Sequence, residues 1–164
     1  MSNLIRQFLW PRASKALLVR VVILVAATLA IGRWALRPMV VDGASMEPTY
    51  ASRGFNFGNL LAYRWNPPKR GDVVLLRYGG QRWFLLKRVL AFAGETVEFR
   101  NGKCLVDGGP LDEPYVKKPC DWTVPPCTVP QGCIYVMGDN RSVPFESHVG
   151  GEIAASRIAG RPLW

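Results

Sequence analysis

The hydropathy pattern opens with a long apolar stretch that carries no charge from Val21 to Gly32. Extended to residues 16–36, the stretch covers 21 positions and is interrupted by Arg20 and Arg33. A helix of that length would measure about 31 Å, close to the thickness of the hydrocarbon core of a bilayer. The pattern therefore predicts a transmembrane anchor over residues 16–36.

Basic residues flank this stretch on both sides. The first 41 residues contain no acidic residue and six basic ones, which are Arg6, Arg12, Lys15 and Arg20 before the run and Arg33 and Arg37 after it. This bias predicts a cytoplasmic basic tail over residues 1–15 and a single-pass protein whose remainder faces the outer side of the cell (inner or plasma) membrane. A cleavable signal peptide is the alternative, because Thr28-Leu29-Ala30 resembles a small-x-small cleavage site.

Residues 37–164 show a different pattern, in which short apolar runs alternate with turn residues. The runs "DVVLLRY" (72–78) and "RWFLLKRVLAF" (82–92) are typical of buried strands. Asn101-Gly102, between two short strands, favours a type I′ hairpin turn. With no helical period of useful length, this region is predicted to be a mainly β, antiparallel β-sheet domain. Residues 107–132, rich in Gly, Pro and Cys, are expected to form an irregular insert.

Net charge argues against a nucleic-acid surface. The chain of 164 residues has a formal net charge of +9, from 21 basic and 12 acidic residues. Six of the basic residues belong to the membrane-flanking segment, so the remainder of the chain is close to neutral, at +3. The basic excess is thus expected to orient the chain in a lipid bilayer rather than to bind nucleic acid.

Four cysteines follow the apolar stretch: Cys104, Cys120, Cys127 and Cys133. An even number in a translocated domain predicts one or two disulfides, whose pairing the sequence leaves open. A zinc site is the alternative, but no C-x-x-C pair is present, so no metal is expected.

Lys87 stands out within an apolar strand. Its neighbours on both faces are otherwise mainly apolar, so its side chain must reach solvent, pair with an acid or lose its proton. Burial penalises the charged form and lowers the pKa of a lysine, which would turn Lys87 into a general base.

Ser45 is the second candidate for chemistry. A serine hydroxyl becomes nucleophilic only when a base takes its proton, and Ser-Lys pairs perform this reaction on several unrelated folds. An ordinary turn serine is the alternative interpretation.

The order of four short motifs carries a resemblance to a known family. These are "SMEPT" (45–49), "PKRGDVVLLRY" (68–78), "LLKRVLAFAGETVE" (85–98) and "MGDNR" (137–141). Together with the preceding anchor, they resemble the conserved boxes of type I signal peptidases, the membrane-anchored serine proteases that remove signal peptides. The resemblance covers nearly the whole chain beyond residue 16.

The resemblance implies a site and a reaction. Ser45 would be the nucleophile, Lys87 the general base, and no cofactor would be needed. Preprotein signal peptides would bind as an added β-strand and be cleaved after small-x-small sites. The residues implied as oxyanion or support groups are Gly43, Met46, Arg88, Asp139, Asn140, Ser142, Glu146 and Ser147.

Several positions depart from the pattern of the family. Gly43 has no hydroxyl where some relatives supply a second oxyanion donor. Pro144 stands where a serine often bonds the catalytic lysine, so Ser142 or Ser147 would have to orient Lys87. Glu146 would pair with Arg88. The lone histidine, His148, replaces an arginine and could titrate near neutrality.

Two other functions remain open from the sequence. A conjugative-transfer-type maturation protease that acts on one dedicated partner would share the anchor, the motifs and the Ser-Lys chemistry. A membrane-tethered β binding module without catalysis would tolerate the loss of Ser45 or Lys87.

Overall fold

The computed structural model describes residues 14–78, 83–118 and 120–164. The chain divides into two units, Met1–Ala35 and Leu36–Trp164. Most of the predicted tail, including Arg6 and Arg12, lies outside the described residues.

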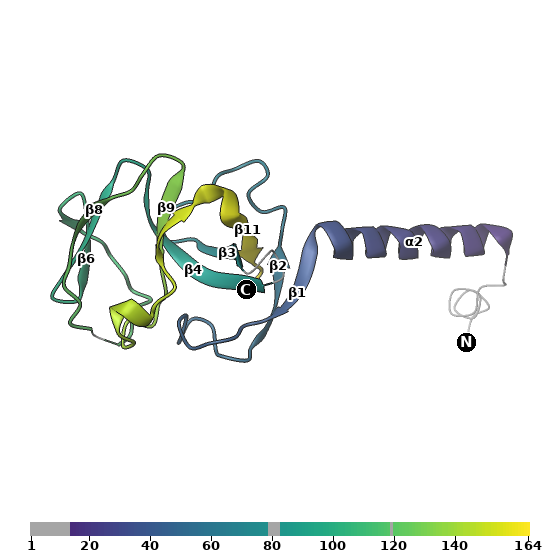
Figure 1. The fold of residues 1–164 in the computed structure, drawn as a ribbon. Helices are drawn as coiled ribbons and strands as arrows, with labels where there is room; N and C mark the ends of the chain where they lie inside the picture. The colour runs from purple at the N-terminus through teal and green to yellow at the C-terminus, as the bar shows by residue number, and fades with distance from the viewer. Residues whose placement is uncertain (1–13, 79–82, 119) are drawn as a thin grey trace. The chain divides into compact units, whose positions relative to one another are not determined.

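The apolar stretch forms helix α2, Lys15–Trp34 (Figure 1). Ser14 caps its N-terminus by accepting a hydrogen bond from the Leu17 N–H at 3.2 Å. No residue of α2 is buried, and within the described residues α2 is the one helix long and apolar enough to cross a membrane. The helix ends at Trp34, two residues before its predicted end at residue 36. Pro38 disfavours a helical conformation at Arg37, so the helix could not have continued past residue 36.

The second unit consists of antiparallel strands, which confirms the predicted fold class. A seven-stranded sheet has the order β1-β2-β11-β3-β4-β9-β10 and a four-stranded sheet the order β7-β6-β5-β8 (Figure 1). The strands of the larger sheet are β1 (Leu36–Val40), β2 (Phe55–Asn59), β3 (Val73–Tyr78), β4 (Trp83–Phe92), β9 (Cys133–Met137), β10 (Gly151–Ala154) and β11 (Ile158–Pro162). Those of the smaller sheet are β5 (Thr96–Arg100), β6 (Lys103–Val106), β7 (Gly109–Pro110) and β8 (Val124–Thr128).

Two predicted strands, β3 and β4, form the centre of the larger sheet. Both faces of β3 are buried: Val74 and Leu76 pack into one apolar cluster and Leu75 into another. The long strand β4 pairs with β3 along Trp83–Arg88, but it pairs with β9 only from Arg88 onward. Within the described residues, one edge of the first half of β4 therefore has no strand neighbour.

The smaller sheet contains both a confirmed and a corrected prediction. Asn101 and Gly102 both have positive φ, at 48° and 78°, as a type I′ turn between β5 and β6 requires. The insert of residues 107–132 is less irregular than predicted, because it contributes β7 and β8, and β8 pairs with β5. Its local sequence concealed this strand, since Pro125 and Pro126 are unusual within a sheet.

The prediction of disulfides is wrong, because all four cysteines are free thiols. Cys104 is buried in the core of the smaller sheet, and this burial raises its pKa to about 12. The thiol of Cys120 donates to the Gly102 carbonyl, and that of Cys127 donates to the Glu152 carboxylate. Cys120 and Cys127 thus have partners other than a second cysteine.

Candidate active site

Ser45 lies in the turn between β1 and β2, held by a loop that follows β9. The Asn140 N–H donates to the Ser45 carbonyl, and Asn140 Nδ2 donates to the Ala44 carbonyl, each at 3.0 Å. On the other side, Met46 is 1% exposed and anchors the turn in an apolar cluster with Leu75. The backbone of Ser45 is therefore fixed from both sides.

Lys87 reaches this turn from β4. Its Nζ donates a hydrogen bond to Ser45 Oγ at 2.8 Å, across 42 positions of sequence. The side chain of Lys87 is 2% exposed. Desolvation lowers the pKa of Lys87 to about 8, and the nearby charge of Asp139 opposes this shift. Near neutral pH a useful fraction of Lys87 is therefore uncharged, and a neutral amine can accept the proton of the same hydrogen bond.

Asp139 neutralises Arg88, the residue that follows Lys87. Arg88 Nε and Nη2 donate to the two carboxylate oxygens of Asp139, at 2.8 and 2.6 Å, and Thr49 Oγ1 donates to the same carboxylate at 2.6 Å. Asp139 is fully buried. The expected pairing of Arg88 with Glu146 is therefore wrong: Glu146 lies exposed in the short helix η1 (Phe145–Ser147).

The two serines expected to orient Lys87 lie elsewhere. Ser142 Oγ donates to Asn140 Oδ1 at 2.6 Å, so it orients the loop that holds Ser45 rather than the amine. Ser147 is exposed in η1. Among the described residues, the hydrogen-bonding partner of the Lys87 amine is Ser45.

Gly43 has a φ of +93°, which favours glycine strongly over other residues. The absence of a hydroxyl at this position thus follows from the backbone conformation of the turn. Within the described part of the chain, the Ser45 N–H has no hydrogen-bond acceptor, so it is available as an oxyanion donor.

His148 packs behind the turn, and both of its ring nitrogens are buried without a hydrogen-bond partner among the described residues. Its ring lies edge-on to Trp122, with ring centroids 4.9 Å apart. Desolvation, with further effects from the positive charges of Lys87 and Arg141, lowers the pKa of His148 to about 4. The expectation that His148 titrates near neutrality is therefore wrong.

Sequence reasoning missed two residues near the site, Glu113 and Tyr115. Arg141, 1% exposed, forms an ion pair with Glu113 of the insert, and the Tyr115 ring covers the guanidinium of Arg88 at 3.9 Å. Nothing local distinguishes "DEPY" in a proline-rich insert, so only contacts between distant segments reveal these residues. Among the described residues, no three His, Cys, Asp or Glu side chains gather as a metal site.

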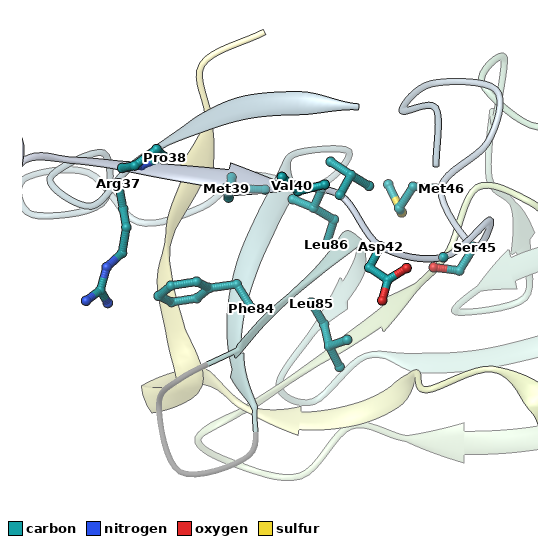
Figure 2. A pocket seen from close by; sticks show the side chains of 12 residues that line it. Arg37, Pro38, Met39, Val40, Asp42, Ser45, Met46, Phe84, Leu85 and Leu86 are labelled. Atoms are coloured by element: carbon teal, nitrogen blue, oxygen red, sulfur yellow. The ribbon is translucent and has the colours of Figure 1, made fainter. Parts of the chain in front are cut away.

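A groove of about 440 Å³ leads to Ser45 (Figure 2). Figure 2 shows residues of β1 and the turn that follows it on one side and Phe84–Leu86 of β4 on the other, with Ser45 near one end and Arg37 near the opposite end. The lining residues are Arg37, Pro38, Met39, Val40, Val41, Asp42, Gly43, Ser45, Met46, Phe84, Leu85 and Leu86.

Known proteins resemble this chain along most of its length. A family model described as signal peptidase, peptidase S26, matches residues 14–164. A probable signal peptidase I-1 of Synechocystis sp. is 35% identical over 135 residues, which cover 77% of this chain and 69% of the relative. A signal peptidase I of Bacillus amyloliquefaciens is 33% identical over 158 residues, covering 90% of this chain and 82% of the relative.

A crystal structure of a signal peptidase I from Enterococcus faecalis V583 is 26% identical, with a TM-score of 0.48, and covers 58% of this chain and 97% of that one. The family model extends over every residue from 14 to the last, and both relatives named above exceed 30% identity over more than two thirds of their own length. On these grounds the chain belongs to the signal peptidase family, peptidase S26, and is a hydrolase of the serine protease class.

Proposed function

We propose that this protein is a membrane-anchored endopeptidase that removes signal peptides from preproteins, with Ser45 as nucleophile and Lys87 as general base. The observation that carries this proposal is the 2.8 Å contact between a buried amine and a serine hydroxyl at the end of a groove. The relatives whose printed names include signal peptidase support the same substrate class.

The reaction begins with a proton transfer. Neutral Lys87 takes the proton of Ser45 Oγ while this oxygen attacks the scissile carbonyl. The carbonyl oxygen becomes an oxyanion, which the Ser45 N–H can meet with a hydrogen bond. When the peptide C–N bond breaks, the ammonium of Lys87 gives its proton to the leaving amine. Lys87, neutral again, then activates the water that hydrolyses the acyl-enzyme.

The groove is suited to a peptide in extended conformation. β1 lies at the edge of the larger sheet, and Phe84–Leu86 of β4 lack a strand neighbour on one side within the described residues. A peptide between these two edges can form backbone hydrogen bonds with them, as in other cases of β-strand addition. Its carbonyl groups would then pass Ser45 at the end of the groove. We infer that small side chains before the cut fit beside Met46 and Leu86.

The apolar helix α2 supports a reaction that takes place near a membrane. We infer that α2 spans a lipid bilayer, with the basic residues before it on the cytoplasmic side and residues 37–164 on the outer face. Ser45 follows Arg33 by 12 residues, which reach about 40 Å even when fully extended. The hydroxyl of Ser45 therefore acts close to the bilayer surface, where a signal peptide emerges.

Cleavage of a preprotein tests the proposal directly. The full chain in detergent is incubated with a preprotein that carries an Ala-x-Ala site, beside the variants Ser45→Ala and Lys87→Ala. Ser156→Ala and Lys103→Ala serve as matched controls, since both side chains are exposed and far from the dyad in sequence. The wild type and both controls should yield mature product and the two dyad variants none. Cleavage by either dyad variant at the wild-type rate would refute the assignment.

A further inference from the structure

The insert places an acidic and an aromatic side chain against two arginines of the active-site region. Tyr115 covers Arg88, with the guanidinium carbon 3.9 Å from the ring centroid. Glu113 pairs with Arg141, and Glu113 Oε1 also accepts a hydrogen bond from the Tyr115 hydroxyl at 2.8 Å. Burial, with Glu113 beside it, raises the pKa of Tyr115, which keeps its hydroxyl protonated as a donor. Glu113 and Tyr115 therefore act as one unit, here called the clamp.

Each arginine held by the clamp contacts the loop that fixes Ser45. Arg88 binds Asp139 through two hydrogen bonds, and Arg141 Nε donates to the Gly138 carbonyl at 2.8 Å. Asn140, which lies between these contacts, holds the carbonyl groups of Ala44 and Ser45. The clamp is thus connected to the nucleophile through two contacts with the same loop, one at Asp139 and one at Gly138.

The clamp also influences the charges that surround the Lys87 amine. Asp139 favours the protonated amine, and Arg88 offsets the charge of Asp139. Among the described residues, His148 also interacts with the amine and is neutral above about pH 5 because its pKa lies near 4, and Ser45 is uncharged before the reaction. Tyr50, near Arg88 and Asp139, stays uncharged because burial raises its pKa. Arg141 adds a positive charge near His148, which Glu113 compensates. If Arg88 were released toward solvent, the carboxylate of Asp139 would face Lys87 with less compensation.

We propose that Glu113 and Tyr115 are positioning residues, which hold Arg88 and Arg141 so that the loop of residues 138–141 keeps Ser45 in place and Asp139 neutralised. This inference rests on the proposed function, because it assigns the clamp a role in the same reaction. An aromatic ring over a guanidinium stabilises it in a desolvated position, where a shorter or aliphatic side chain would not. The insert is then a part of the catalytic machinery that acts through other residues.

Replacement of the ring separates this role from a general effect on folding. In Tyr115→Leu, we expect kcat to fall at least about tenfold and the rise of kcat/KM with pH to move toward alkaline values by about half a unit or more. Tyr115→Phe keeps the ring over Arg88 and should recover most of the lost rate. Tyr78→Leu is the matched control, since Tyr78 also lies against an arginine, Arg157 at 5.8 Å, in another part of the sheet.

A second variant covers the case in which Tyr115→Leu fails to fold. Glu113→Gln keeps the size of the side chain and removes the charge that pairs with Arg141. We expect it to lower kcat. Because Arg141 would then carry an uncompensated positive charge, the pKa of Lys87 should fall and the pH profile should move toward acidic values. A purely structural role predicts reduced thermal stability with an unchanged pH profile in both variants, and that result would overturn the proposal.

A readout independent of cleavage separates this inference from the proposed function. The lysine Cε signals of the full chain in detergent are titrated by NMR, and Lys87 is assigned by its loss in Lys87→Met. The titration midpoint of Lys87 should rise in Tyr115→Leu and stay unchanged in Tyr78→Leu. A missing rise counts against the clamp even if the wild type cleaves. Conversely, a wild type without cleavage counts against the function even if the rise is seen.

Discussion

Arg88 and Asp139 meet through two hydrogen bonds of 2.8 and 2.6 Å, within electrostatic range of the Lys87 amine. Asp139 is the acid that acts on Lys87 electrostatically, and its charge opposes the effect of desolvation on the pKa of this lysine. The same carboxylate also accepts the hydroxyl of Thr49 in the turn that carries Ser45. This ion pair therefore connects the geometry of the nucleophile with the basicity of the amine.

Asp139→Asn should affect both properties. Loss of the charge removes the group that raises the pKa of Lys87, so the rise of kcat/KM with pH should move toward acidic values. The variant also leaves Arg88 buried without its counter-ion, which should lower the free energy of unfolding by about 3 kcal/mol. Denaturant unfolding and a pH-rate profile measure the two effects. Asp112→Asn, at an exposed aspartate, is the control and should change neither.

The pH dependence of the wild type should follow the neutral form of Lys87. The folded protein holds the pKa of Lys87 at about 8, and only the uncharged amine can take the proton from Ser45. The value of kcat/KM should therefore increase about tenfold per pH unit below 8 and level off above it. Initial rates with a peptide substrate between pH 6 and 10 test this expectation. A continued increase up to pH 10 would mean that Lys87 behaves like an ordinary solvated lysine.

Gly138→Ala should displace the nucleophile. A Cβ atom at this position would lie 2.2 Å from the Ser45 carbonyl oxygen and 3.1 Å from its carbon, so backbone atoms would have to move. We expect a fall in kcat of at least about tenfold and a loss of about 1–3 kcal/mol in the free energy of unfolding. Gly109→Ala is the matched control, because its added Cβ would meet the nearest atom, the Val106 carbonyl oxygen, at 3.5 Å. Equal activity of the two variants would contradict the placement of Gly138.

His148 should make the protein sensitive to acid. Its pKa is about 4 in the folded protein and about 6.5 when the chain is unfolded, so between these values the unfolded chain binds more protons. Stability is then retained above pH 6.5 and lost as the pH falls toward 4. His148→Phe removes this contribution, so the variant should lose less thermal stability than the wild type between pH 7 and 4.5. Parallel melting curves in both proteins would show that His148 is solvated instead.

The sequence predicted the elements whose signals are local. The apolar run, the buried strands around Leu75 and Leu86, and the Asn101-Gly102 turn follow from hydropathy and turn chemistry over a few neighbouring residues. Lys87 stood out because a lysine within an apolar strand must reach solvent, pair with an acid or lose its proton. The choice among these outcomes, and the role of Ser45, rested on the resemblance carried by the four motifs.

Pairings between distant segments were beyond the reach of these local patterns. Arg88 was expected to pair with Glu146, and only the folded loop shows that Asp139 faces it while Glu146 is exposed. The partners of Glu113 and Tyr115 likewise depend on how the insert packs against the larger sheet. The histidine was misjudged because its burial comes from Trp122, which lies 26 positions earlier in the chain.

The change of partners along β4 has a consequence for the range of sequences that the protein can accept. An unpaired strand edge offers amide and carbonyl groups, and every incoming chain carries the same groups whatever its side chains. Binding through backbone groups favours a peptide in an extended conformation and depends little on the identity of most of its side chains. Selectivity of the proposed peptide binding would then come from the few places in the groove where side-chain bulk is excluded.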